Sequence, residues 1–194
     1  MGIAALADLV LSDDTLATAM RDARNGLVPA LDLTAPGALR PFVVKGLVDA
    51  GRTVLAVAAT AREAEDLVTA LGGLMDPATV AYYPAWETLP HERLSPRSDT
   101  VGRRLAVLRR LRHPGTDVSN GPIQVVVAPV RSLLQPQFRG LADLEPVELS
   151  VSAEVELDDV VRLLAGAAYS RVDLVEKRGD FAVRCCIIDF FPPT

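Results

Sequence analysis

The chain has 194 residues, of which 49% are hydrophobic and 23% charged, and its 25 acidic and 20 basic residues leave a formal charge of −5. This composition excludes a disordered or collagen-like chain, and the negative charge argues against bare nucleic acid as the main partner, because binding phosphates requires a basic surface. Two cysteines indicate no disulfide framework, and no apolar run reaches the about 18 residues that span a bilayer, so we expect a soluble cytoplasmic protein.

The first part of the chain, up to residue 135, alternates helices and strands. Two helices are predicted within the first 25 residues, the second beginning after an N-cap at 12–14. Strands are predicted over 27–33, 53–59, 80–83 and 123–128, and helices over 36–49, 61–71, 99–112 and 129–134. Almost wholly apolar runs such as 53–59 are typical of strands that are buried on both faces. This order therefore predicts a parallel sheet covered by helices.

The last part of the chain has the pattern of a smaller α+β module with antiparallel strand pairs. An alternating stretch over 146–151 predicts a strand, 157–168 an amphipathic helix, and 171–175, 181–184 and 187–191 short strands, with a turn at 177–180. The whole formal charge of −5 falls within 136–194. We therefore predict an α/β protein with two domains, 1–135 and 136–194.

A working nucleotide-binding loop of the Walker A type needs a lysine that is followed by serine or threonine. The only lysines are Lys45 and Lys177, and neither is followed by such a residue. The chain therefore carries no competent Walker A motif, and we expect no ATP hydrolysis and no cofactor.

A motif rich in prolines and aromatic residues follows the predicted strand at 80–83. It reads Tyr-Tyr-Pro-Ala-Trp-Glu-Thr-Leu-Pro-His-Glu-Arg-Leu-Ser-Pro over 82–96, and by itself it indicates a stiffened loop with a buried tryptophan. Further on come Tyr-x-Arg-Val-Asp at 169–173, Arg-Gly-Asp-Phe-Ala-Val-Arg at 178–184 and Ile-Ile-Asp-x-Phe-Pro at 187–192. In this order the motifs resemble the N-terminal region of bacterial transcription-repair coupling factors, which is itself similar to the excision-repair helicase subunit UvrB.

The resemblance covers the chain from about residue 30 to its end and implies a fold. It implies a RecA-like domain 1a over 1–135 and a UvrA-binding domain 2, truncated at its C-terminus, over 136–194, in an N-terminal fragment of a longer protein. In UvrB the turn equivalent to 33–40 is a working Walker A motif. Here it keeps Gly37, between Thr34 and Arg40, but lacks Gly-Lys-Thr. We therefore expect a degenerate nucleotide loop that has lost ATP hydrolysis.

The resemblance also implies which residues contact UvrA. Arg171 and Arg184 match positions at which UvrB and the coupling factors use arginines to reach UvrA, and a planar guanidinium pairs well with carboxylates. Arg178 and Phe181 are further candidates on the same exposed side. Strand alternation places Phe181 and Arg184 on opposite faces, so we favour the arginines as central contacts. UvrB has another arginine where this chain has Ala182. The alternative is that the arginines pair with the acidic residues of their own domain.

The predicted helix over 99–112 carries a cluster of arginines: Arg103, Arg104, Arg109, Arg110 and Arg112. One interpretation is that they contact the DNA backbone. The other, which we favour, is that they form the solvated face of an amphipathic helix whose leucines pack inward.

Two cysteines stand at 185 and 186, where the family usually has Gly-Gly or Gly-Ala. Adjacent Cα atoms lie about 3.8 Å apart, below the roughly 4.4 Å that a disulfide needs. We therefore expect two reduced thiols on opposite faces of a strand. No metal site is expected, because neither His91 nor His113 has a second ligand at a useful spacing.

Three functions follow from these observations. The leading hypothesis is a non-catalytic module that recruits UvrA in transcription-coupled repair. The resemblance adds that the full-length protein contacts RNA polymerase and DNA through other domains, and that a C-terminal domain masks the UvrA-binding face. The alternative is an ATP-hydrolysing helicase-type domain acting on DNA. An enzyme for a small molecule would need an acid–base pair, for which the sequence offers only scattered acids such as Glu87 and Glu92.

Overall fold

The computed structural model describes residues 3–26, 29–88, 96–115, 120–137, 139–145, 147–167 and 169–193. The chain forms two compact units, Met1–Ala85 with Arg110–Gln137, and Trp86–Arg109 with Phe138–Thr194. Each unit has its own three-stranded sheet, so the chain is a mixed α/β protein, as predicted. This division places residues 86–109 with the second unit, whereas the sequence analysis places them in the first domain. The predicted domain limits, 1–135 and 136–194, stay a prediction.

The first unit is built on a parallel sheet with the strand order β1-β3-β2. Strand β1 is Val54–Ala58, β2 is Val80–Tyr82 and β3 is Val125–Pro129. Strand β3 is buried at every position, as expected for a central strand with the sequence VVVAP. It pairs with Val54–Ala58 on one side and with Val80–Tyr82 on the other.

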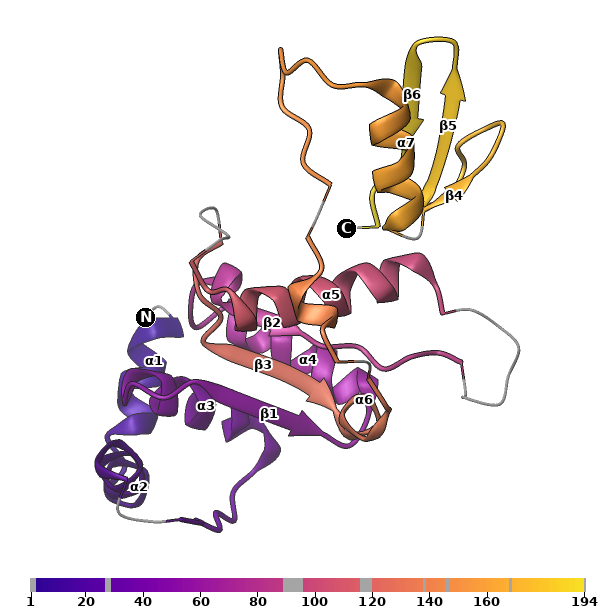
Figure 1. The fold of residues 1–194 in the computed structure, drawn as a ribbon. Helices are drawn as coiled ribbons and strands as arrows, with labels where there is room; N and C mark the ends of the chain where they lie inside the picture. Colours follow the sequence, from indigo (N-terminus) through magenta and orange to yellow (C-terminus); the bar gives the residue numbers. More distant parts are fainter. Residues whose placement is uncertain are drawn as a thin grey trace. The chain divides into compact units, whose positions relative to one another are not determined.

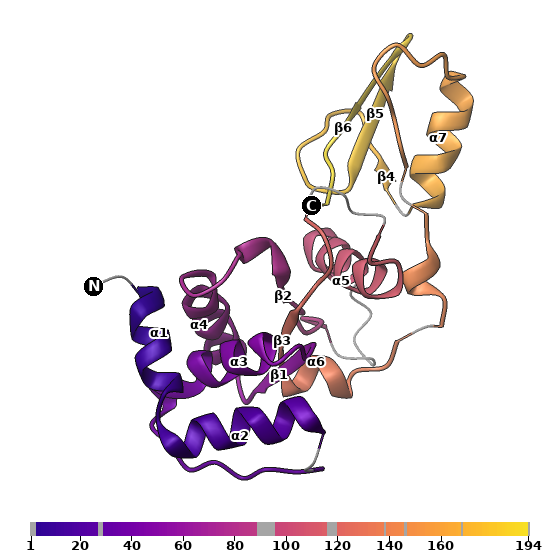
Figure 2. The same ribbon diagram turned by 90° about the vertical axis from the view of Figure 1, so that its left-hand side faces the viewer.

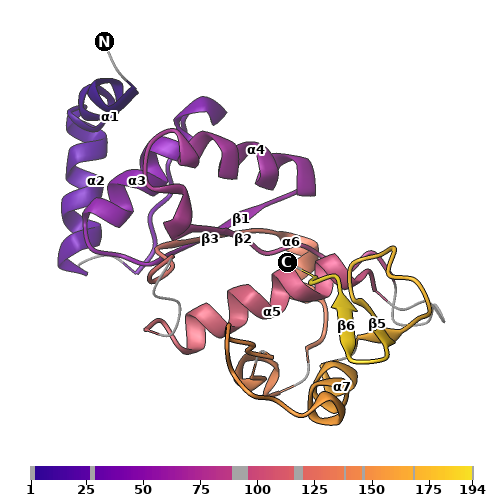
Figure 3. The ribbon, with the colours of Figure 1, turned by 90° about the horizontal axis from the view of Figure 1, so that it is seen from above.

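Two helices, α3 (Arg40–Asp49) and α4 (Ala61–Gly72), pack against this sheet (Figure 3). The core between them consists of small and branched side chains: Val44, Ala56, Ala58, Ala64, Leu71, Val125 and Val127. Helix α4 begins where the Thr60 hydroxyl accepts a hydrogen bond from the Glu63 amide, which satisfies a free donor of the first turn. A short helix, α6 (Val130–Leu134), follows β3.

Two helices at the start of the chain, α1 (Ile3–Leu11) and α2 (Asp14–Asn25), pack against α3 (Figures 1 and 2). The Asp13 carboxylate caps α2 by accepting from the amides of Thr15 and Leu16, as the sequence predicts. Close packing on α3 depends on Gly46, where a Cβ would lie 2.7 Å from the Met20 sulfur.

The second unit contains the sheet β4-β5-β6 and one helix packed against it (Figure 1). The elements are α7 (Leu157–Gly166), β4 (Ser170–Arg171), β5 (Asp180–Arg184) and β6 (Ile187–Phe190). Strands β5 and β6 form the predicted hairpin, but β4 runs parallel to β5. The core contains Val160 and Leu164 from α7 and Phe181 from β5. Helix α5 (Ser98–Arg112) also belongs to this unit, up to Arg109.

Two predicted strands are wrong over the residues that the structure describes. Residues 29–36 contain no strand, and Pro29 lacks the amide hydrogen that a paired strand would donate. Residues 147–150 are also irregular, because Val147 is the one described residue of this stretch that packs into the core, whereas Val151 is 99% exposed. Short one-turn 3-10 helices occur at Gly37–Leu39, Pro77–Thr79 and Leu141–Asp143. Among the described residues, no helix is both long enough and apolar enough to cross a membrane.

Candidate protein-interaction site

The tip of the β5–β6 hairpin brings together several residues that the sequence singled out. Arg184 and Ile187 are the last paired residues, so Cys185 and Cys186 form a two-residue turn between them. The φ angle of Cys185 is +53°, in the left-handed region that favours glycine. Both thiols are free and exposed. The prediction that they lie on a strand is therefore wrong, because a tight hairpin needs two residues outside the ladder.

Arg184 is exposed at the end of β5, and its side chain reaches toward the segment after β4. Its Nη2 atom donates a hydrogen bond to the carbonyl oxygen of Asp173, with a distance of 3.0 Å. The Arg184 guanidinium therefore binds the backbone of Asp173 and not its carboxylate. Two exposed aliphatic side chains are close to these residues. Leu174, 59% exposed, follows Asp173 in the chain, and Ile187, 67% exposed, pairs with Arg184 across the hairpin. Arg184, Leu174 and Ile187 form what we call the hairpin surface.

Arg171 lies on β4, where it pairs in register with Phe181 of β5. Its side chain is exposed. Within the described part of the chain, the Arg171 guanidinium has no hydrogen-bond or ion-pair partner. The positive charge is therefore available to an acidic group from outside the domain.

Phe181 lies in the core of the second unit, with only 1% of its surface exposed. It packs with Val160 and Leu164 of α7, and Val183 is partly buried on the same strand face. The alternation predicted for β5 is thus correct, with Phe181 and Val183 on one face and Arg184 exposed. The prediction that Phe181 lies on an exposed side is wrong, because α7 covers that face of the strand.

Arg178 is held by the last residues of the described chain. Its guanidinium lies 4.9 Å from the centre of the Phe191 ring and donates to the Pro192 carbonyl oxygen at 3.1 Å. The same turn contains Gly179 with a φ of +85° and the Asp180 carboxylate, which accepts from the Lys177 amide. Arg178 therefore stabilises the turn, and its predicted contact with UvrA stays a prediction.

The predicted nucleotide loop is exposed and irregular. Thr34 lies in a stretch without regular structure, and Gly37 begins a single 3-10 turn with open space where a Cβ would stand. Arg40 begins α3 and forms an ion pair of 3.5 Å with Glu63 of α4. Gly37 has no positive φ, so the loop lacks the left-handed residue of an anion-binding nest. A degenerate nucleotide site here stays a prediction.

Three of the arginines proposed as DNA contacts are engaged within their own unit. Arg104 is only 1% exposed and stacks 4.2 Å from the Trp86 ring centre. Arg109 donates to the Leu144 carbonyl oxygen, and Arg110 donates to backbone carbonyls, among them that of Ala78. Arg103 is exposed. These contacts favour a structural role for the cluster over a shared DNA surface.

The motif at 82–96 is described only in part. Residues 89–95, which include His91 and Glu92, lie outside the described residues. Glu87 accepts a hydrogen bond from the Thr100 hydroxyl, which joins this segment to α5. Within the described ranges, no three histidine, cysteine or acidic side chains converge on a common point.

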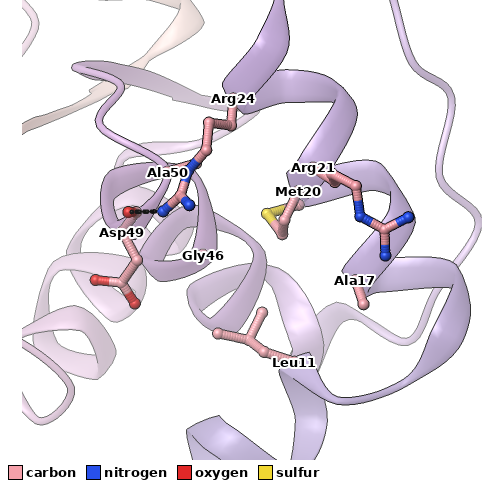
Figure 4. Close-up of a pocket in the computed structure, with 8 residues that line it drawn as sticks. All are labelled: Leu11, Ala17, Met20, Arg21, Arg24, Gly46, Asp49 and Ala50. Atoms are coloured by element: carbon pink, nitrogen blue, oxygen red, sulfur yellow. Dashed lines mark hydrogen bonds between the residues drawn. The ribbon is translucent and has the colours of Figure 1, made fainter.

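A shallow groove of about 310 Å³ lies between α2 and α3 (Figure 4). Its floor contains Met20 and Gly46, and at its edge Arg24 donates to the Asp49 carbonyl oxygen at 3.1 Å. None of the residues predicted to be functional lines this groove.

Leu174 and Ile187 are the members of the hairpin surface that sequence reasoning did not identify. The sequence holds only a weak signal for them, because single exposed aliphatic residues are common on protein surfaces. Phe181 is the apolar candidate that the sequence favours because it is aromatic, although strand alternation places it opposite Arg184.

Comparison with known proteins gives consistent matches. A family model described as the UvrB interaction domain matches residues 147–194, which include α7 and the whole second sheet. Transcription-repair-coupling factors of Mycobacterium bovis and Mycobacterium tuberculosis are each 49% identical over 192 residues, which is 99% of this chain and 15% of theirs. That of Myxococcus xanthus is 32% identical over 169 residues, 81% of this chain and 13% of its own. The chain thus spans less than a sixth of the length of these relatives.

Proposed function

Since the chain belongs to the transcription-repair coupling factor family, we propose that it acts in transcription-coupled repair as a non-catalytic module that recruits UvrA. The surface for this contact contains Arg171, on the edge strand β4, and Arg184, at the end of β5. The apolar part is supplied by Leu174 and Ile187 and not by the buried Phe181. Interface centres are more apolar than the rest of a protein surface and are enriched in arginine, and this composition meets both conditions.

The strongest support for this proposal is that its two arginines lack carboxylate partners within the described part of the chain. Arg171 and Arg184 have no carboxylate partner among the residues that the structure describes, although 136–194 are rich in acids. Arg162 of α7, by contrast, pairs with Asp159 one turn away. Arginines without an internal carboxylate partner are available to an acidic partner, since their pairing with it breaks no internal salt bridge.

The proposal is tested by measuring the affinity of the chain for purified UvrA. Arg171→Ala and Arg184→Ala each remove a predicted central contact, and such changes typically cost about 2 kcal/mol or more. This corresponds to about a thirtyfold loss of affinity. Arg162→Ala is the matched control, because it removes an exposed arginine of the same unit that already has an internal partner. Equal affinity of both test variants and wild type would show that this face is not the interface.

ATP hydrolysis, RNA polymerase binding and DNA translocation belong, in this proposal, to parts of a coupling factor outside this chain. The loop at 33–40 supports the absence of ATP turnover, because Pro41 removes an amide donor near the start of α3 and Arg40 pairs with Glu63. Magnesium-dependent hydrolysis that follows the protein through further purification would favour the helicase alternative. We also expect the isolated chain to bind UvrA more tightly than a full-length coupling factor, in which a further domain masks the face.

A further inference from the structure

The two cysteines of the chain are adjacent and occupy the exposed turn of the β5–β6 hairpin. Arg184 directly precedes them and Ile187 directly follows. A group attached to either sulfur therefore starts within one residue of the hairpin surface. A peptide-sized adduct is comparable in size to the turn itself, so it is long enough to reach Arg184.

We propose that the Cys185–Cys186 turn is a thiol-modification site at which a low-molecular-weight disulfide forms a mixed disulfide that covers Arg184. Only the consequence for UvrA binding rests on the proposed function. In the reaction, the cysteine thiolate attacks one sulfur of the small disulfide. A new sulfur–sulfur bond forms, the original one breaks, and the departing thiolate takes up the proton that the cysteine released. The protein thiol is oxidised and half of the small disulfide is reduced.

The neighbouring cysteine does not remove this adduct efficiently. To do so it would have to form a disulfide with the adjacent residue, whose Cα atom is about 3.8 Å away, below the roughly 4.4 Å that unstrained disulfides need. The mixed disulfide therefore persists until an external thiol reduces it. The modification is therefore reversible, and its extent depends on the ratio of small disulfide to thiol.

The chemical step is tested with oxidised glutathione, and peptide mass spectrometry reports the site. We expect a glutathionyl group on the peptide that contains the turn, removed by dithiothreitol, and none on the Cys185→Ser/Cys186→Ser double variant. Wild type that stays unmodified in excess oxidised glutathione overturns the proposal.

Coverage of Arg184 has its own readout, which does not depend on UvrA. Phenylglyoxal labels exposed arginines, so we expect the adduct to slow the labelling of Arg184 severalfold and to leave Arg162 of α7 unchanged. Equal labelling of Arg184 with and without the adduct overturns the inference, whatever UvrA does.

Binding to UvrA separates this inference from the proposed function. We expect the adduct to weaken binding at least about tenfold, with recovery after dithiothreitol, while the double-serine variant binds equally before and after treatment. Unmodified wild type that does not bind UvrA refutes the proposed function, while the mass spectrum and the labelling of Arg184 still decide the modification. An adduct that forms and leaves UvrA binding unchanged refutes the regulatory part.

Discussion

Replacement of Gly179 by alanine should strongly destabilise the second unit. Gly179 has a φ of +85°, and a Cβ there would lie 2.7 Å from the Ser98 Oγ and 2.9 Å from the Ser98 Cβ. The hydroxyl can rotate away, but the Ser98 Cβ is fixed to the backbone of α5. The left-handed conformation costs a residue with a Cβ about 1–2 kcal/mol, and overpacking costs about 1–3 kcal/mol. We expect a loss of about 2–5 kcal/mol in the free energy of unfolding.

The contact and the conformation can be separated by a matched substitution in the same unit. Gly140 also has a φ of +85°, but nothing lies within 4 Å of the position of its Cβ. Gly140→Ala should therefore show only the conformational cost of about 1–2 kcal/mol. Ser98→Gly removes the opposing Cβ, so combining it with Gly179→Ala should recover the overpacking part, measured as a coupling energy of about 1–3 kcal/mol.

The assay is unfolding in urea followed by the fluorescence of Trp86, the only tryptophan of the chain, which belongs to the second unit. Circular dichroism reports on the whole chain, including the helices of the first unit, and is compared with the fluorescence signal of the second unit. Equal losses for Gly179→Ala and Gly140→Ala, with no coupling to Ser98, would refute the close contact between α5 and the turn at Gly179.

Three further predictions concern the same unit. Phe181→Ala should destabilise it by about 3–5 kcal/mol in the same urea assay, because this side chain is in the core, and a change below about 1 kcal/mol would contradict its burial. Cys185→Gly should stabilise it by about 0.5–1 kcal/mol, since glycine relieves the positive φ at some cost in unfolded-state entropy, and Cys186→Gly serves as the control. Burial raises the pKa of Tyr169 above 10.0, so the unfolded chain loses this phenol proton more readily, and the free energy of unfolding should fall as the pH rises above 10.0. Tyr169→Phe should remove part of this fall, whereas an unchanged pH profile would show that Tyr169 does not contribute.

The elements that the sequence predicted well are those with strong local signals. Strands β1 and β3 are almost wholly apolar, and the α2 and α4 helices begin at Asp13 and Thr60, whose side chains cap them. The failures at 27–33 and 146–151 have a common cause. A short stretch becomes a strand only when a neighbouring strand pairs with it, and the local pattern holds no information on that partner.

The candidate site was predicted in part for a similar reason. Alternation along β5 correctly separated Phe181 from Arg184, because a strand exposes alternate side chains on opposite faces. It did not indicate which face α7 covers, since that depends on packing between segments distant in the chain. The buried stacking of Arg104 on Trp86 was missed for the same reason, because an arginine-rich helix gives no local sign that one of its charges is internal.

The strand order β1-β3-β2 has a consequence for synthesis of the protein. Both β1 and β2 pair with β3, which is the last of the three to leave the ribosome. Between β2 and β3 the ribosome makes the whole of Trp86–Arg109, a segment of the second unit whose partners, Phe138–Thr194, come later still. Neither unit can therefore complete its fold before synthesis of the other unit has started. In a nascent chain that stops ahead of Val125, β1 and β2 lack the strand with which they pair. Helix α5, whose Arg104 is buried in the folded protein, lacks the rest of its unit. Such intermediates are prone to aggregate.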